Sequence, residues 1–205
     1  MKKQLKSHES ASYLLDEFDV NENLRINAGL RYSTFMHVGP FTRYIKGDIS
    51  KQDSIVDYKK NDVIKFYHGL EPRVSLRWML KDRSSIKAGY SYNYQYVHLT
   101  SLSAVSLPTD IWYPTTNIAK PQRGWQGSLG YFKNFKQNMF ETSVELYYKG
   151  MNNLIEYRDG FSPDQNVNNN ADNNFVFGKG DSYGAEFFIR KNGKKLTGWI
   201  GYTLA

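Results

Sequence analysis

The chain has 205 residues, of which 40% are hydrophobic and 16% aromatic, and this length suffices for one sizeable domain. It contains no cysteine, which excludes disulfides, thiolate metal sites and cysteine nucleophiles. A mean hydropathy of -0.62 and the lack of an 18-residue apolar run exclude a transmembrane helix, but not a membrane β-barrel, whose strands are only half apolar. A net charge of +7 would permit nucleic-acid binding. The basic residues are scattered and form no stripe, so we expect no nucleic-acid partner.

Eight segments alternate between apolar and polar residues with the period of two that is typical of β-strands. In the second segment, Leu24, Ile26 and Ala28 share one face, while Arg25 and Asn27 share the other. No segment shows a convincing helical period. The sequence therefore predicts an all-β fold, an antiparallel up-and-down meander of about eight long strands. The predicted strands cover residues 10–19, 23–35, 67–80, 84–96, 123–132, 139–157, 183–191 and 195–205.

The connections between these segments alternate strictly between short turns and long loops, the latter at residues 36–66, 97–122 and 158–182. Transmembrane β-barrels have this alternation, because their turns on one side are short and their loops on the other are long. Several predicted strands also exceed the usual length of about 5–6 residues and reach the roughly 9–11 residues that cross a bilayer. A soluble sheet with one wet face would explain the charge-free apolar faces but neither the strand lengths nor the loops. We therefore expect part of a transmembrane barrel wall.

Aromatic residues lie near both ends of the predicted strands. Tyr92, Tyr94 and Tyr96 come at a long-loop end, whereas Phe18 and Trp78 come at short-turn ends. Girdles of aromatic rings at both membrane interfaces are typical of such barrels. The alternative is aromatic cross-strand pairing in a soluble sheet.

The segment from Gly180 to Gly184 matches G-x-S-x-G, the pattern around many hydrolase nucleophiles. A nucleophile elbow needs a strand before the serine and a helix after it. Here an Asn-rich stretch precedes Ser182 and a period-two segment follows it. We therefore expect the segment to lead into a β-hairpin, Ser182 not to be a nucleophile, and the protein not to be an enzyme.

The last two strands are predicted to form a hairpin around Asn192-Gly193, since Asn-Gly is a strong two-residue turn signal. With that turn, Ile189 would face Leu196 and Phe187 would face Gly198. The Asn-rich run at residues 165–174, with Asp164 and Asp172, lacks the ordered ligand spacing of a calcium loop. We interpret this run as a solvated loop.

Several stretches together resemble successive barrel strands of TonB-dependent outer-membrane receptors. They are "NLRINAGLRYS", "GLEPRVSLRW", "SSIKAGYSYNYQ", "SVELYYKGMNNLIEYRDG" and "GDSYGAEFFIRKNGKKLTGWIGYTLA". In that family a signal peptide, a TonB box and a plug domain precede a barrel of about 22 strands. None of these is present in the sequence, which also ends within a predicted strand. The resemblance thus implies that residues 1–205 are a partial β-barrel domain, an interior segment of the wall.

The resemblance also implies nutrient uptake across the outer membrane of a Gram-negative bacterium, with a siderophore, glycan or similar ligand. The implied partners are outer-membrane lipid, the small-molecule nutrient and the TonB complex, which would act through the absent N-terminal parts. No cofactor is expected. Two alternatives stay open: a stand-alone small outer-membrane barrel acting as an adhesin or structural protein, and a soluble β-sandwich that binds carbohydrate.

Two sets of residues are candidates for the lumen and the ligand site. Loop aromatics can stack on a sugar or siderophore ring, although exposed aromatics also pack loops; the candidates are Tyr44, His98, Trp112 and Tyr113. The charges predicted to face the lumen, where they can attract an anionic ligand or pair with one another and the plug, are Arg25, Arg31, Glu71, Arg73, Arg77, Lys87, Glu141, Glu145 and Glu186. The four histidines, His8, His37, His68 and His98, show no metal-ligand spacing, so no metal site is expected.

Overall fold

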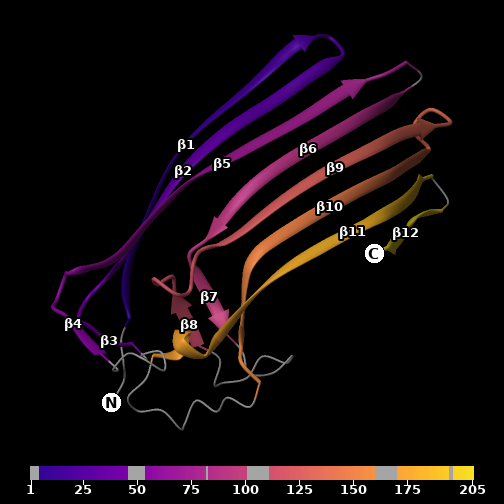
Figure 1. Cartoon of the computed structure of the whole chain (residues 1–205). Coiled ribbons are helices and arrows are strands. Elements are labelled where there is room, and N and C mark those ends of the chain that lie inside the picture. The colour runs from indigo at the N-terminus through magenta and orange to yellow at the C-terminus, as the bar shows by residue number, and fades with distance from the viewer. Residues whose placement is uncertain (1–4, 46–53, 82, 101–110, 160–169, 194–195) are drawn as a thin grey trace.

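A computed structural model describes residues 5–45, 54–81, 83–100, 111–159, 170–193 and 196–205. Its main feature is one eight-stranded antiparallel sheet in which neighbours in space follow one another along the chain (Figure 1). This confirms the predicted all-β meander. The strands, in sheet order, are β1 (Lys6–Asn21), β2 (Leu24–Val38), β5 (Val63–Met79), β6 (Ser84–Gln95), β9 (Gln122–Phe135), β10 (Phe140–Tyr157), β11 (Phe175–Asn192) and β12 (Thr197–Leu204).

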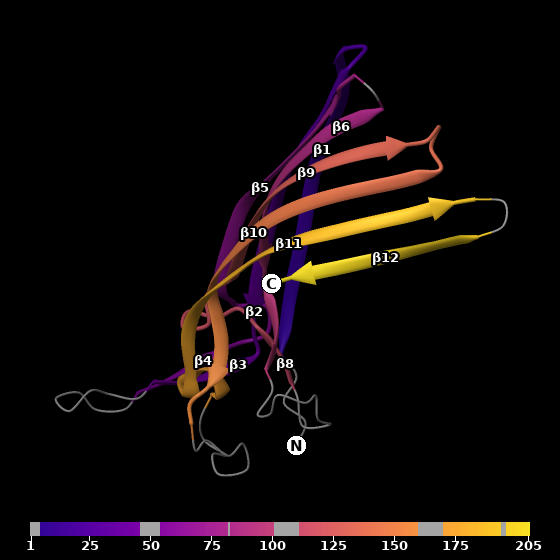
Figure 2. The ribbon, with the colours of Figure 1, turned by 90° about the vertical axis from the view of Figure 1, so that its right-hand side faces the viewer.

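The sheet is open, with β1 and β12 as its two edges. It forms a single curved layer, and in Figure 2 no second sheet covers β9, β10, β11 or β12. A β-sandwich needs two packed sheets, so this architecture contradicts the carbohydrate-binding sandwich. No helix among the described residues has the length and hydropathy to span a membrane.

The predicted long loops contain short elements of their own. β3 (Phe41–Ile45) pairs with β4 (Ser54–Tyr58), and β7 (Val97–Thr100) pairs with β8 (Ile111–Pro114). A 3-10 turn, η2 (Ala171–Asn174), precedes β11. Strands of four or five residues give too few repeats for a period-two pattern to stand out, so the sequence did not reveal them.

The cross-strand register confirms the two faces predicted for the sheet. Leu24 pairs with Trp78, Ile26 with Leu76, and likewise Arg25 with Arg77. We call the side of the sheet with Leu24, Ile26 and their row partners the apolar face, and the side with Arg25 and Arg77 the charged face. Many large apolar side chains on the apolar face are exposed to the surroundings, among them Leu30, Val74, Leu129, Leu146 and Ile200. This is the surface that a lipid bilayer can cover.

The register of the last hairpin differs from the prediction. Ile189 pairs with Ile200 and Phe187 with Tyr202, because β11 continues through Asn192 and the connection spans residues 193–196. The two-residue turn was therefore wrong. Each residue's partner lies four positions further along β12 than expected, and an even shift leaves every side chain on its own face. The alternation of apolar and polar residues could not distinguish the two registers.

Candidate functional site

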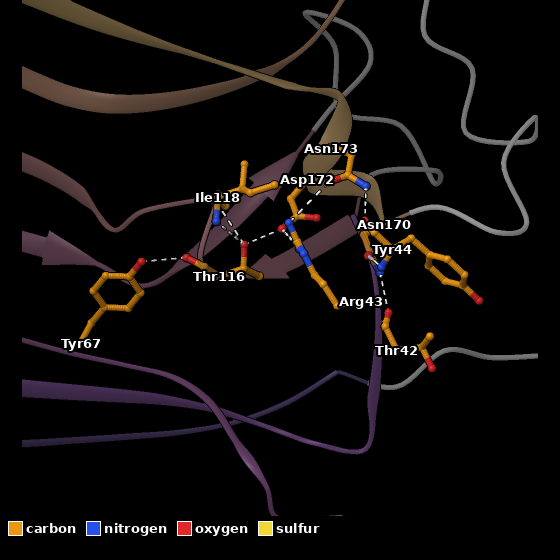
Figure 3. A network of polar contacts seen from close by, with 10 residues as sticks. Thr42, Arg43, Tyr44, Tyr67, Thr116, Ile118, Asn170, Asp172 and Asn173 are labelled. Carbon is orange, nitrogen blue, oxygen red and sulfur yellow. Dashed lines mark hydrogen bonds and ion pairs between the residues drawn. The ribbon is translucent and has the colours of Figure 1, made fainter. Parts of the chain in front are cut away.

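Three connections that are far apart in the sequence meet at one end of the sheet (Figure 1). They are β3, the segment that follows β8, and η2, and Figure 3 shows their side chains converging. We call this assembly the loop cluster: residues 41–45, 96–100, 111–121, 157 and 170–175. The strand ends carry these segments to the same place because each long connection lies at the same end of the meander.

Asp172 is the centre of the loop cluster. Its Oδ2 atom accepts a hydrogen bond from Arg43 Nη1 at 2.6 Å and another from the Thr116 hydroxyl. Asp172 is 1% exposed and Arg43 6%. Coulomb attraction is strong in such a buried setting, and the paired charges offset part of their desolvation cost. One carboxylate thereby ties together three segments of the chain.

Two asparagines of the Asn-rich run bind the backbone of β3. Asn170 accepts a hydrogen bond from the Tyr44 amide at 2.7 Å and donates one to the Thr42 carbonyl at 3.0 Å. Asn173 donates to the Tyr44 carbonyl at 2.9 Å. The interpretation of this run as a solvated loop is thus wrong for residues 170–174, while Asp164 and residues 165–169 lie outside the described residues. An Asn side chain can replace a strand neighbour because it carries both a donor and an acceptor.

A buried aromatic core lies next to this polar network. Tyr113, Ala119, Tyr157 and Phe175 are buried together, and the Phe175 ring makes edge contacts with Tyr113 at 5.3 Å and Tyr157 at 5.1 Å. Burial, reinforced by the neighbouring Asp172 carboxylate, raises the pKa of the Tyr113 hydroxyl well above 10. Tyr113 therefore stays neutral and packs the loop cluster.

The structure separates the four predicted ligand aromatics. His98 and Tyr113 face each other across the β7–β8 hairpin and are 1% and 4% exposed, so neither side chain can touch a ligand in this arrangement. Trp112 lies on the other face of the hairpin and is 65% exposed. Tyr44 is half-buried on β3, and in Figure 3 its ring points away from the Arg43–Asp172 pair.

His98 is held as a neutral imidazole. The Thr115 hydroxyl donates to the Tyr96 carbonyl at 2.6 Å, so His98 Nε2 must carry the proton in its 3.2 Å hydrogen bond to that hydroxyl. Burial lowers the pKa of His98 from 6.5 to about 4. His98 thus positions Thr115 and the start of the loop that leads to Thr116.

The sequence suggested that Tyr96 belongs to an exposed aromatic girdle, but the structure buries it. It is 2% exposed, donates or accepts a hydrogen bond at 2.8 Å with Ser33, and stacks on Phe35 at 5.3 Å. The neighbouring Tyr94 ring fills the space over Gly69, where an added Cβ would lie 2.3 Å from it. The pairing of β6 with β5 ends at Ser91, and beyond it these rings pack against Gly69 and Phe35 of the neighbouring strands.

Of the predicted lumen charges, several are paired. Arg31 binds Glu71 at 3.1 Å, and Glu71 is 1% exposed. Arg25 binds Asp19 at 2.7 Å. Others contact neighbouring side chains: Arg73 donates to Asn93 at 2.9 Å, Lys87 lies 4.2 Å from the Phe132 ring centre, Glu141 accepts from Asn192 at 2.8 Å and lies 3.9 Å from Arg190, and Glu145 accepts from Ser143 at 3.3 Å. Charge pairing thus accounts for part of this set.

The other end of the charged face carries a hollow of about 780 Å³. Five of the predicted lumen charges are among its lining residues, namely Arg77, Lys87, Glu141, Glu145 and Glu186. Both signs of charge meet there, which suits a protein surface of mixed charge better than a single anionic ligand.

Ser182 lies within β11, opposite Lys149, and not in a turn between a strand and a helix. Groups of three or more His, Asp or Glu side chains that could hold a metal ion are not found among the described residues.

Comparison with known proteins identifies the sheet. The family model described as TonB dependent receptor-like, beta-barrel matches residues 3–205. The chain belongs to this family. The eight strands are therefore wall strands of a TonB-dependent receptor barrel in the outer membrane of a Gram-negative bacterium, as the resemblance implied. This family consists of receptors and not of enzymes. No curated protein matches the chain.

Solved receptor barrels share the fold. The iron transporter FrpB from Neisseria meningitidis superposes with a TM-score of 0.61 at 12% identity, over 98% of this chain and 26% of FrpB. The alcaligin outer membrane receptor FauA from Bordetella pertussis gives 0.58 at 17% identity, over 97% and 30%. The pyoverdine receptor FpvA from Pseudomonas aeruginosa, solved with pyoverdine bound, gives 0.58 at 15%, over 96% and 24%. The chain therefore spans about a quarter to a third of these receptors.

Proposed function

We propose that the receptor containing this chain imports a small nutrient, with an iron–siderophore complex as the first candidate, across the outer membrane in a TonB-dependent step. The observation that carries this proposal is the full-length match to the receptor barrel family. FrpB is an iron transporter, and FauA and FpvA are siderophore receptors by name, which favours this ligand class over a glycan. An adhesin role gains no support, because β1 and β12 do not pair to close a small barrel.

In this proposal the two faces have different tasks. The apolar face lies against lipid, and the charged face lines the lumen, where Arg77, Glu141 and Glu186 face the plug domain or permeating ligand. The loop cluster lies at the long-loop end, where extracellular ligands arrive. Its buried core holds the β7–β8 hairpin so that Trp112, which is 65% exposed, is presented for stacking on a ligand ring.

Uptake measurements test the proposal. A strain lacking the receptor gene is supplied with the full-length receptor, and accumulation of radioactive iron is followed with a panel of ferric siderophores, with and without TonB. We expect TonB-dependent accumulation of at least one siderophore. Normal insertion in the outer membrane without uptake of any siderophore in the panel would contradict the iron assignment.

The variant Trp112→Ala tests the role of the hairpin. We expect weaker binding of the imported siderophore, seen as a raised Kd with unchanged outer-membrane abundance. The matched control is Trp78→Ala, because Trp78 is also exposed, at 48%, but lies on the apolar face at the turn end of β5, away from the lumen and the loop cluster. Equal effects of the two substitutions would contradict a ligand contact at Trp112.

A further inference from the structure

The loop cluster covers only part of the charged face at the loop end of the sheet. Ser33 on β2 and Glu71 on β5 lie on this face and are 0% and 1% exposed. Two contacts hold the cover in place. The Tyr96 hydroxyl lies 2.8 Å from the Ser33 hydroxyl, and the Tyr67 hydroxyl donates to the Thr116 carbonyl at 2.8 Å (Figure 3). No ligand therefore reaches the wall over β2 and β5 at this level.

The charged face of the neighbouring strands β6, β9 and β10 carries a second hollow, of about 310 Å³. Gln126 and Lys149, which line it, are exposed. The residues of its two central rows, read from β6 to β10, are Ser91, Gln126 and Lys149, and then Asn93, Gly124 and Met151. Sites for small molecules begin at a volume of about 300 Å³. The hollow is thus large enough for one part of a ligand.

The lining of this hollow contains amides and basic residues but no acidic residue of the described chain. The side chains of Gln122, Gln126 and Lys149 make no hydrogen bond or ion pair with the rest of the described residues. Amide and ammonium groups donate to oxygen atoms, and an ammonium group favours oxygens that carry negative charge. The hollow at the turn end differs, since three glutamates line it. Oxygen atoms with negative charge therefore suit the hollow at the loop end.

Small and apolar residues complete the hollow on its β10 side. A Cβ added to Gly124 would meet only the Gly150 carbonyl oxygen, at 4.0 Å, so a ligand can approach the β9 backbone there. Met151 and Leu154 line the same hollow. Both side chains reach towards Gly180 of β11, where an added Cβ would lie 3.4 Å from Met151 and 3.0 Å from Leu154. An apolar part of a ligand can pack on these two side chains while its oxygen atoms face the amides of β9.

A β-bulge in β10 brings Leu154 to this hollow. The register shifts between Asn152 and Leu154, and the extra residue, Asn153, has a φ of 58°. The Asn153 side chain donates a hydrogen bond to the Pro121 carbonyl at 2.8 Å, which ties the bulge to the loop cluster. Without the bulge, strict alternation would place Leu154 on the apolar face together with Asn152. Bulges often re-aim a side chain next to a functional site.

We propose that this hollow is a ligand subsite on the lumen wall that takes an anionic, oxygen-rich part of the imported nutrient. Lys149 pairs with a negatively charged oxygen, and Gln122 and Gln126 donate hydrogen bonds to the oxygens beside it. Met151 and Leu154 support the apolar part of the ligand. A nutrient reaches this face only by permeating the lumen, so the subsite rests on the proposed import function.

Charged thiol reagents test the subsite in the full-length receptor without its nutrient. Residues 1–205 contain no cysteine, and any cysteine outside them is replaced by serine. The variant Gln126→Cys is labelled with anionic sulfonatoethyl or cationic trimethylammonioethyl methanethiosulfonate. A lysine charge about 7 Å away in water changes the local concentration of a monovalent anion about three-fold. Adding Lys149→Gln should therefore slow the anionic reagent about three-fold and speed the cationic reagent as much.

Lys179→Gln is the matched control for this labelling, because Lys179 lies on the adjacent strand β11 but on the apolar face, in the row of Asn152. We expect it to leave both labelling rates unchanged. Labelling rates that do not respond to Lys149→Gln, or that respond equally to Lys179→Gln, overturn the subsite.

Two tryptophan substitutions on β9 test whether the nutrient uses the hollow. Gly124→Trp fills it, whereas Gly127→Trp adds the same ring on the apolar face, where an added Cβ would meet no atom within 4 Å. With the ferric siderophore that the wild type accumulates as the probe, we expect Gly124→Trp to lose uptake and Gly127→Trp to retain it, at equal outer-membrane abundance. Lys149→Gln is the milder variant and should raise the Kd at least about ten-fold, through loss of a charged hydrogen bond.

Equal uptake by the two tryptophan variants, together with an unchanged Kd in Lys149→Gln, overturns the subsite while leaving the import function intact. If the wild-type receptor accumulates no siderophore, the import function fails instead. The labelling rates, which need no nutrient, then decide by themselves whether the hollow attracts anions.

Discussion

The wall and the loop cluster of this receptor barrel are stabilised in opposite ways. In the wall, each strand is hydrogen-bonded to its neighbours, and large side chains such as Leu129 and Leu146 are about half exposed on the apolar face. In the loop cluster, Arg43 and Asp172 form an ion pair that is almost completely buried. The wall thus leaves its apolar surface for lipid, whereas the cluster buries charged and aromatic groups among themselves.

This difference predicts which substitutions destabilise each region. A new charge on the apolar face of the wall meets hydrocarbon, where nothing can pair it. The removal of a charge from the cluster leaves its partner buried and unpaired, which costs more than the pair itself contributes. The expected effects below run from the largest to the smallest.

The largest effect is expected for Asp172→Ala. The substitution leaves the Arg43 guanidinium buried without its carboxylate, and such a loss costs about 3–5 kcal/mol. We expect hydrogen exchange to rise in β3–β4 and in residues 170–175, with the wall strands unchanged. Asp57→Ala is the control, since Asp57 is exposed on β4. Unchanged exchange around η2 would contradict the central role of Asp172.

In the wall, Leu129→Arg is expected to destabilise the barrel by about 2–4 kcal/mol, because the new charge would lie near the middle of the apolar band. Ser128→Arg introduces the same charge one residue away on the charged face and should have little effect. Urea unfolding in lipid vesicles, followed by heat-modifiable gel mobility, measures the difference. Similar midpoints for the two variants would show that the assignment of faces is wrong.

Acidification should loosen the loop cluster before it affects the wall. The pKa of His98 is about 4 in the folded cluster and 6.5 when exposed, so the unfolded form binds the proton more tightly. The stabilisation is complete above pH 6.5 and is lost as the pH falls towards 4, by at most about 3 kcal/mol. Hydrogen exchange of β7–β8, corrected for its intrinsic pH dependence, should report this. The variant His98→Gln, whose side chain cannot titrate, should lose most of this pH dependence. If the pH dependence of exchange is the same in the variant, other groups must cause it.

The smallest effect is expected where Tyr94 packs over Gly69, at the loop end of the wall. Gly69→Ala would place a Cβ 2.3 Å from the Tyr94 ring, and overpacking of this kind costs about 1–3 kcal/mol. Gly127→Ala adds the same methyl group to another strand glycine where the space is open, so it should be neutral or slightly stabilising. Thermal unfolding of both variants measures the contrast. Equal stability would mean that Tyr94 moves aside without cost.

Much of the wall could be predicted, because its pattern repeats every two residues. The alternation of Leu24, Ile26 and Ala28 with Arg25 and Asn27 indicated the strand and its two faces, and the register confirms them. The β11–β12 register could not be obtained in this way, since a slip that keeps each residue on its face leaves the pattern unchanged. Hydrogen-bonded pairing of residues 185–192 of β11 with β12 decided it.

The candidate site was predicted less well. The sequence identified His98, Trp112 and Tyr113 as loop residues of interest, but not that Trp112 alone of the three would be exposed. It also gave no sign that Asp172 would be the buried centre of the loop cluster.

The sequence by itself determined the meander, the two faces and the end of the sheet that carries the long loops, because these follow from patterns between near neighbours. Only the tertiary structure decided how the loops pack. Arg43 lies 129 positions and Thr116 56 positions from Asp172. Contacts over such separations leave no local period in the sequence, and the energy of a buried ion pair arises only once other segments have excluded water from it.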